Sequence, residues 1–296
     1  MLLTERLAAP APPAINGMPT PDRVVEVWFP DIDNKAATGA ASPTQPAPLP
    51  MICVPYAGGT PSIFRGWAAE LGTAAEVIPV LLPGRGLRGR EQPYTTMQPL
   101  VEDLVTALIG HGLDQEYVLF GHSMGALVAY EVACELRRRG YPEPAHLFVS
   151  GSKAPHLYGD RADHLLADAQ LCQLVRDLGG LGPDEQTGEA YLQRRLPVLR
   201  ADLTVCERYR WSPRPPLRCA MTAISGIGDP IATAAQVEAW REHTTGSLLR
   251  RHVPGGHFYL LGPARSLLLT ELHRELDALA RARAGAFAEL SGRNHS

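Results

Sequence analysis

Residues 117–129 read YVLFGHSMGALVA, and this stretch decides the fold. Its first four residues, Tyr117 to Phe120, form an apolar run with the length of a short buried strand. Residues 126–139 have a helical pattern, because their apolar side chains recur at the spacing of one helix face. Gly121-His122-Ser123-Met124-Gly125 lies between the two patterns. The sequence therefore predicts a strand, a tight turn that carries Ser123, and a helix.

A G-x-S-x-G pentapeptide at a strand-to-helix turn is typical of the nucleophile elbow of α/β-hydrolases. The turn is so tight that side chains beside the serine would clash, so Gly121 and Gly125 must both be glycine. We expect the Ser123 hydroxyl to stand above the sheet, with the N-terminus of the helix beneath it. The bare pentapeptide arises often by chance, and its position between a strand and a helix makes it informative.

The rest of the chain repeats the alternation of strand and helix. Apolar runs of strand length occupy 51–54, 77–82, 117–120, 147–150, 219–224 and 249–253, and amphipathic helical patterns occupy 62–71, 97–109, 126–139, 234–244 and 263–282. Strands that alternate with helices indicate a mainly parallel sheet covered on both faces. We therefore predict an α/β-hydrolase fold.

One connection interrupts this rhythm. Residues 154–216 contain no strand pattern, only the helical segments 163–178 and 188–209 joined by a glycine-rich turn. We predict that this insertion, about 155–216, forms a helical lid over the active site. The predicted catalytic domain covers 23–283 and begins with an edge strand at 23–29. Residues 1–22 are expected to form a flexible N-terminal arm and 284–296 a C-terminal tail.

Composition narrows the classes of function. The 296 residues carry a net charge of −3, which gives no indication of nucleic acid or a membrane surface as a partner. No apolar run approaches the roughly 18 residues of a membrane helix, and the N-terminus lacks the pattern of a signal peptide. The five cysteines are dispersed without metal-type spacing, as expected for buried free thiols in a reducing compartment. We expect a cytoplasmic protein without a metal site.

A serine hydroxyl needs a base, and the base needs an acid that orients it. In this fold the chain order is serine, then an acid, then histidine. Asp229 follows the strand 219–224 in SGIGDP, and His257 follows the strand 249–253 in PGGHF. Parallel strands deliver both loops to the edge that carries Ser123. We predict a catalytic triad of these residues. Asp202 is the rival acid, but it falls inside a lid helix.

The oxyanion formed during attack needs preset N–H donors. One is the backbone N–H of Met124, directly after the nucleophile. The second should come from the loop after the strand 51–54, which reads PYAGGT, and we choose the N–H of Ala57. The alternative is an ordinary glycine turn without a role in catalysis.

Taken together, these motifs resemble the type II thioesterases, which are stand-alone hydrolases that accompany modular polyketide and non-ribosomal peptide synthases. The resemblance covers roughly 25–279 and rests on six motifs. They are PYAGG at 55–59, LPGRG at 82–86, GHSMGA at 121–126, LRAD at 199–202, GDP at 228–230 and GGHF at 255–258. Tyr56 stands where the family often has histidine.

The resemblance implies a substrate and a partner. The substrate would be an acyl group held as a thioester on the phosphopantetheine arm of an acyl or peptidyl carrier protein, bound transiently and in trans. Such enzymes remove stalled or wrong acyl groups from the assembly line. Thiolate leaves readily, so a serine acyl-enzyme followed by attack of water suffices, and no cofactor is expected.

Binding residues are less clearly marked. Tyr56 is a candidate for substrate binding. Arg85 and Arg88, with Arg90, form a basic loop that could meet an acidic carrier helix or the pantetheine phosphate, or could simply be solvated. The motif Arg200-Ala201-Asp202 is expected to make a structural ion pair or helix contact. The apolar lid stripe is expected mainly to pack the lid and in part to line an acyl channel; it comprises Leu171, Leu174, Val175 and Leu178.

Three other functions stay open at this point. The chain could be a carboxylesterase or lipase that acts on free esters. It could be a macrocyclising thioesterase, although those usually follow a fused carrier domain. It could also be a hydrolase-fold protein that binds a ligand without catalysis, although intact serine, acid, histidine and glycine-loop candidates disfavour this.

Overall fold

A central parallel sheet organises the protein. The computed structural model describes residues 27–33, 47–113, 116–180 and 185–293. Six strands pair side by side in the order β2-β1-β3-β4-β5-β6, and every pairing is parallel. Their bounds are β1 Leu49–Val54, β2 Ala75–Pro79, β3 Val118–His122, β4 His146–Ser150, β5 Ala220–Gly226 and β6 Leu248–Val253. The elbow strand β3 lies near the middle of the sheet, where both of its neighbours are strands.

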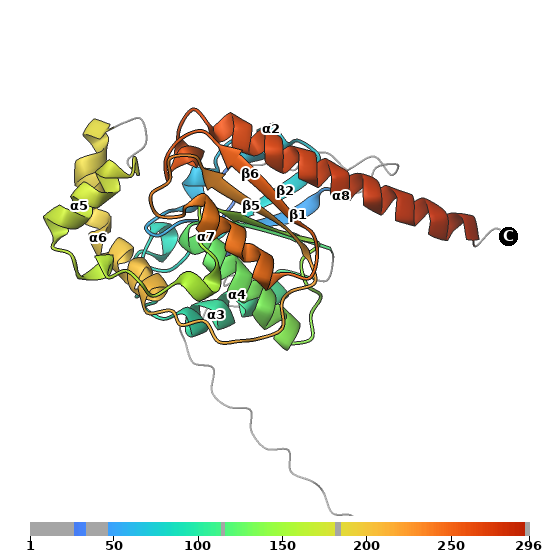
Figure 1. Cartoon of the computed structure of the whole chain (residues 1–296), viewed down its shortest axis with the longest axis horizontal. Helices are drawn as coiled ribbons and strands as arrows, with labels where there is room; N and C mark the ends of the chain where they lie inside the picture. Colours follow the sequence, from blue (N-terminus) through green and yellow to red (C-terminus); the bar gives the residue numbers. More distant parts are fainter. Residues whose placement is uncertain (1–26, 34–46, 114–115, 181–184, 294–296) are drawn as a thin grey trace, which may run out of the picture.

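Helices cover both faces of this sheet (Figure 1). One face carries α3 (Met97–Gly110), α4 (Met124–Arg138) and α7 (Ala234–Glu238), and the other carries α2 (Trp67–Leu71) and α8 (Arg265–Arg293). Successive strand residues point to opposite faces: Ile52 belongs to the core under α3 and α4, whereas Met51 and Cys53 belong to the core under α2 and α8. The two cores explain why the strands are almost continuously apolar.

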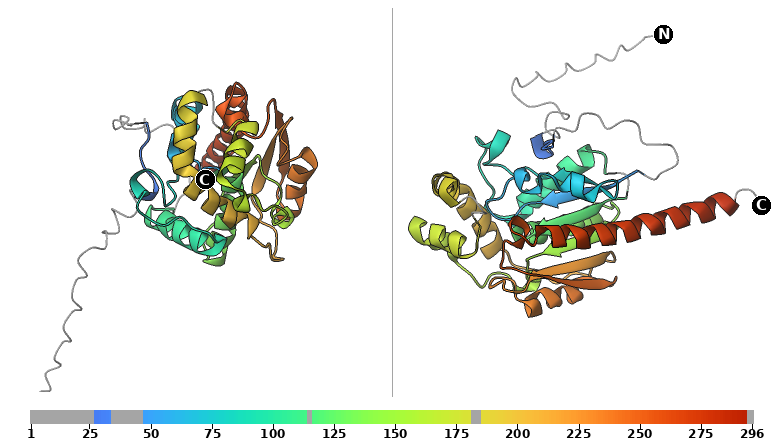
Figure 2. Two further views of the ribbon diagram at one scale, coloured as in Figure 1. Left: turned by 90° about the vertical axis from the view of Figure 1, so that its left-hand side faces the viewer. Right: turned by 90° about the horizontal axis from the view of Figure 1, so that it is seen from above.

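The segment between β4 and β5 is helical throughout its described part. It contains α5 (Asp168–Asp177), α6 (Glu185–Glu207) and the short 3-10 turns Pro155–Leu157 and Asp163–Leu165. A small core of its own joins α5 to α6 and includes Leu171 and Leu196. Figures 1 and 2 place these two helices at one end of the molecule and the C-terminal end of α8 at the other.

The structure confirms the predicted fold class and all six strands. The helical patterns are also confirmed, although 62–71 divides into a 3-10 turn (Pro61–Phe64) and α2, and 234–244 divides into α7 and a 3-10 turn (Ala239–His243). The predicted edge strand at 23–29 is wrong in its described part, because residues 27–29 contain no strand. Residues 1–22 lie outside the described chain.

Two further features concern the ends and the thiols. Helix α8 continues to Arg293, so most of 284–296, which we predicted as a tail, is helical. All five cysteines are free and buried, as their spacing predicted. No helix in the described part of the chain is both long and apolar enough to cross a membrane.

Candidate active site

Ser123 occupies a strained turn between β3 and α4. Its φ of 54° and ψ of −120° make it the one non-glycine residue with positive φ among those described. A Cβ on Gly121 would lie 2.1 Å from the carbonyl oxygen of Gly125, and one on Gly125 would lie 2.1 Å from that of Val54. Neither position can hold a larger residue, because backbone occupies the space. The turn therefore places the half-buried Ser123 at the N-terminus of α4.

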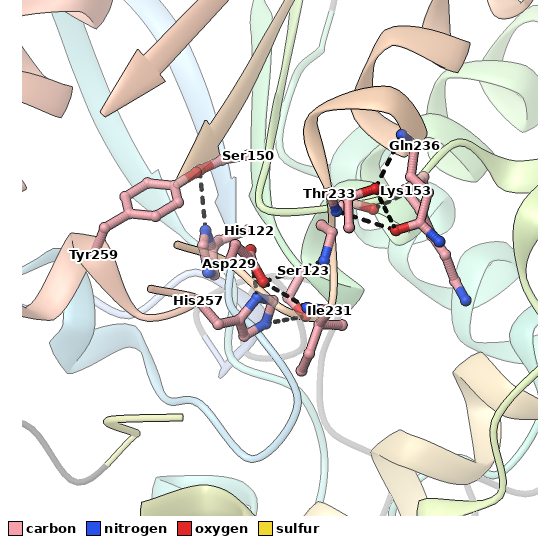
Figure 3. Close-up of polar contacts among 12 residues, drawn as sticks. His122, Ser123, Ser150, Lys153, Asp229, Ile231, Thr233, Gln236, His257 and Tyr259 are labelled. Carbon is pink, nitrogen blue, oxygen red and sulfur yellow. Dashed lines mark hydrogen bonds and ion pairs between the residues drawn. The ribbon is translucent and has the colours of Figure 1, made fainter. Parts of the chain in front are cut away.

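The structure brings Ser123, Asp229 and His257 together. His257 Nε2 lies 3.0 Å from Ser123 Oγ, and His257 Nδ1 lies 2.8 Å from Asp229 Oδ2 (Figure 3). Ser123 and Asp229 precede His257 by 134 and 28 residues in the sequence. All three meet because β3, β5 and β6 end at the same edge of the sheet. Both distances are those of ordinary hydrogen bonds. The imidazole is thus placed to accept the hydroxyl proton while the carboxylate orients the ring.

Backbone donors hold the second oxygen of the Asp229 carboxylate. Asp229 Oδ1 accepts hydrogen bonds from the N–H groups of Ile231 at 2.8 Å and Ala232 at 3.1 Å. With His257 on the other oxygen, the buried carboxyl group has three donors. These three contacts fix the direction in which Oδ2 points.

A second network of hydrogen-bonded polar side chains lies beside His257. His122 Nδ1 lies 2.9 Å from Ser150 Oγ, which in turn contacts the Tyr259 hydroxyl (Figure 3). The His122 ring centroid is 5.2 Å from that of His257. Burial, followed by repulsion from His257, lowers the pKa of His122 well below its usual range. His122 therefore stays neutral and adds no second positive charge when His257 takes a proton.

No motif in the sequence pointed to this network of polar side chains. Ser150 ends β4 and Tyr259 begins a short 3-10 turn (Tyr259–Leu261) after β6, and neither residue belongs to a recognisable motif. The pairing of β4 with β3 places Ser150 opposite His122, and the turn after β6 brings the Tyr259 hydroxyl to Ser150.

Both predicted oxyanion donors lie beside the nucleophile. Ala57 and Met124 line the same cavity as Ser123 and His257. Met124 is the first residue of α4, where backbone N–H groups have no partner within the helix. Ala57 lies in the loop after β1, which closes through a hydrogen bond of 2.8 Å from the Gly59 N–H to the Tyr56 carbonyl. The arrangement can receive negative charge at the N-terminus of α4.

The cavity beside Ser123 encloses about 840 Å³, its opening to solvent included. One wall is apolar and comes from the insertion; it consists of Leu171, Leu174, Val175, Leu178, Leu199, Leu203 and Cys206. Tyr56 and Phe258 form another wall, with their ring centroids 4.9 Å apart. The lining also includes polar residues, among them Lys153, which pairs with Asp160. The predicted acyl-channel residues of α5 and Leu178 thus line the same cavity as Ser123, and Leu171 also belongs to the small core of the insertion.

Arg85 and Arg88 correct our expectation of a basic binding loop. The Arg85 side chain is buried and makes a two-pronged ion pair with Asp202, at 2.7 Å and 2.8 Å. Arg88 is also buried, bonds to Glu91 and packs 3.9 Å above the ring of Trp28. Their guanidinium groups are therefore committed inside the protein and do not face a carrier; Arg90 alone of the three is exposed.

Asp202, the rival acid, is bound to Arg85 rather than to His257. Arg200 in the same motif bonds to Asp168 and to the carbonyl groups of His164 and Leu166. The motif makes structural contacts, as expected. Among the described residues, no group of three or more His, Cys, Asp or Glu side chains is placed to hold a metal ion.

Comparisons with known proteins show similarity to thioesterases. A family model described as "Thioesterase domain" matches residues 49–278. The solved structure of the RedJ thioesterase from the prodiginine pathway of Streptomyces coelicolor is 61% identical, with a TM-score of 0.76, and the match covers 80% of this chain and 91% of that one.

Two relatives extend the comparison. The chain is 37% identical over 218 residues to thioesterase PikA5 of Streptomyces venezuelae, covering 73% of this chain and 78% of that protein. It is 42% identical over 217 residues to a Brevibacillus parabrevis protein named linear gramicidin dehydrogenase LgrE, covering 72% and 82%.

Proposed function

The chain belongs to the thioesterase family and is an enzyme that hydrolyses thioesters, and we propose that Ser123, His257 and Asp229 carry out this reaction on acyl groups attached to carrier proteins. The observation that carries the proposal is the distance of 3.0 Å between His257 Nε2 and Ser123 Oγ, both of which line a cavity with an apolar wall. LgrE is named a dehydrogenase, whereas the family model, PikA5 and RedJ are all named thioesterases.

Acylation would begin with proton transfer from Ser123 Oγ to His257 Nε2. The freed oxygen attacks the thioester carbonyl carbon, and the carbonyl oxygen becomes an oxyanion that accepts from the N–H groups of Ala57 and Met124. As the intermediate collapses, the carbon–sulfur bond breaks and the thiolate leaves, taking the proton from His257. The acyl group then remains on Ser123 as an ester.

Deacylation repeats the same steps with water. His257 Nε2 takes a proton from a water molecule, the resulting hydroxide attacks the Ser123 ester, and the second oxyanion occupies the same donors. Collapse returns the proton to Ser123 Oγ and releases a carboxylic acid. Asp229 holds the Nδ1 proton throughout and stabilises the imidazolium that forms twice in each cycle.

The names and the cavity support the carrier-bound substrate. RedJ is named from a biosynthetic pathway, and PikA5 is named a thioesterase. An apolar wall beside Ser123 suits an acyl chain, and Tyr56 is the residue that we propose contacts it near the reacting carbonyl. By this proposal the enzyme edits polyketide or non-ribosomal peptide assembly in trans, with an acyl or peptidyl carrier protein as its transient partner.

Carrier proteins loaded with a panel of acyl groups test the proposal directly. Intact-protein mass spectrometry before and after exposure to the enzyme should show loss of the acyl mass with wild type and none with Ser123→Ala. Ser123 should also take up one fluorophosphonate label. If the acyl carrier is cleaved no faster than a p-nitrophenyl ester of the same acid, the carboxylesterase alternative is favoured and the carrier-bound substrate is wrong.

A further inference from the structure

Helix α6 of the insertion binds the loop that carries the proposed oxyanion donor Ala57. Asp202 Oδ2 accepts a hydrogen bond of 2.7 Å from the Gly58 N–H, and Arg195 Nη2 donates one of 2.7 Å to the Gly58 carbonyl. Both side chains come from α6, so both peptide groups next to the Gly58 Cα are held by one helix. Leu199 of α6 also packs close to Gly58, whose φ is 75°.

Arg85 extends this contact to the next residue of the loop. Its Nη1 donates to the Gly59 carbonyl at 3.0 Å and to Asp202 Oδ2 at 2.8 Å, while its Nη2 donates to Asp202 Oδ1 at 2.7 Å. Arg85 and Asp202 are respectively 3% and 2% exposed, so water competes little for these bonds. The buried pair therefore holds the Gly58 N–H and the Gly59 carbonyl with charge-assisted hydrogen bonds, and Arg195 holds the peptide group between them.

We propose that Asp202 and Arg85 are positioning residues that set the Ala57 N–H at its place in the oxyanion hole, so that this hole is complete only while α6 is docked on the loop. The proposal rests on Ala57 being an oxyanion donor. It explains why an acid in the lid lies outside the triad and yet belongs to the motif LRAD. It also couples the wall of the acyl cavity to the donor Ala57, because α6 supplies residues of that wall and binds the loop that carries Ala57.

Two variants test the positioning role. Asp202→Asn keeps one acceptor oxygen but turns an amide N–H₂ toward the donors of Arg85 or Gly58. The double variant Arg85→Met/Asp202→Asn removes the buried charge entirely while keeping an acceptor for the Gly58 N–H, which protects the fold. We expect kcat to fall by about 10²-fold, the effect of roughly 1 Å of misplacement, with KM nearly unchanged.

The readouts separate positioning from mere stability. kcat and KM are measured with an acyl-N-acetylcysteamine thioester and with p-nitrophenyl acetate, well below the melting temperature, together with the rate of fluorophosphonate labelling of Ser123. Labelling and kcat should fall together, and the pH profile of kcat/KM should keep its shape, because His257 and Asp229 are untouched. Asp168→Asn, which removes an exposed ion pair to Arg200 in the same insertion, is the matched control and should retain wild-type kcat.

Two outcomes would overturn the inference. Wild-type kcat in a folded double variant would show that the pair contributes stability alone. A pH profile altered in the manner of Asp229→Asn would show that Asp202 acts on the imidazole instead. The proposed substrate fails separately, if wild type hydrolyses p-nitrophenyl acetate and takes up the label but leaves acyl carriers intact; the positioning test is then still read from the ester and the label.

Discussion

Replacing Asp229 by asparagine changes the proton on His257 while leaving the shape of the site intact. The N–H groups of Ile231 and Ala232 require an acceptor, so the amide oxygen takes the place of Oδ1. The amide N–H₂ then faces His257 Nδ1, which in wild type lies 2.8 Å from Oδ2. A donor at that position forces Nδ1 to accept. The ring proton must therefore move to Nε2, the atom that faces Ser123.

An imidazole protonated at Nε2 cannot take the proton of Ser123. The variant also lacks the negative charge that stabilises the imidazolium. By analogy with the serine-protease triad we expect kcat to fall by up to about 10⁴-fold, which corresponds to about 5 kcal/mol in the activation free energy. KM and the melting temperature should change little, because asparagine has the same shape and keeps both backbone hydrogen bonds.

The assay is steady-state hydrolysis of an acyl thioester between pH 6 and 9, with circular dichroism to verify folding. Asp277→Asn is a matched control: it removes another Asp–His contact, the half-exposed pair of Asp277 with His273 on α8, and should not alter kcat. If Asp229→Asn retains kcat within a factor of about ten of wild type, the triad assignment is refuted, since the loss expected from the wrong tautomer is far larger.

Three further predictions concern the turn, the pH dependence of stability and the cavity. Gly121→Ala places a Cβ 2.1 Å from a backbone oxygen and should lower the free energy of unfolding by about 3 kcal/mol in a urea titration, the upper end of overpacking costs; Gly262→Ala, with nothing within 4 Å, is its control. Burial lowers the pKa of His146 from 6.5 to about 4, so below pH 6.5 the unfolded chain gains a proton that the folded chain does not. The free energy of unfolding should therefore decrease as the pH decreases, by about 2 kcal/mol from this residue between pH 7.5 and 5. His146→Gln should reduce that difference in urea titrations at the two pH values. Leu203→Trp enlarges a side chain of the apolar wall and so narrows the cavity, and it should lower kcat/KM for an octanoyl thioester relative to an acetyl thioester by about tenfold or more. Equal losses for both substrates would contradict a role for this wall in acyl binding.

Most of the fold could be predicted from local patterns. The strands are buried on both faces, so each appears in the sequence as a short apolar run, and the helices between them show one apolar face. The prediction failed for residues 27–29, where alternation of apolar and polar residues was taken for an edge strand. Trp28 is buried there against Arg88, a contact between distant residues that alternation within seven residues does not reveal.

Part of the candidate site could likewise be predicted from the sequence, and part could not. The sequence alone determined the elbow, because the spacing of Gly121, Ser123 and Gly125 follows from steric limits within one turn, and it ordered Asp229 and His257 after their strands. Only the tertiary structure decided the partners of the charged groups. The sequence placed Arg85 in a basic loop that was either solvated or able to meet a carrier, yet Arg85 is buried against Asp202, 117 residues away. Electrostatic pairing depends on which elements pack together in space, and a sequence motif records only residues that are neighbours along the chain.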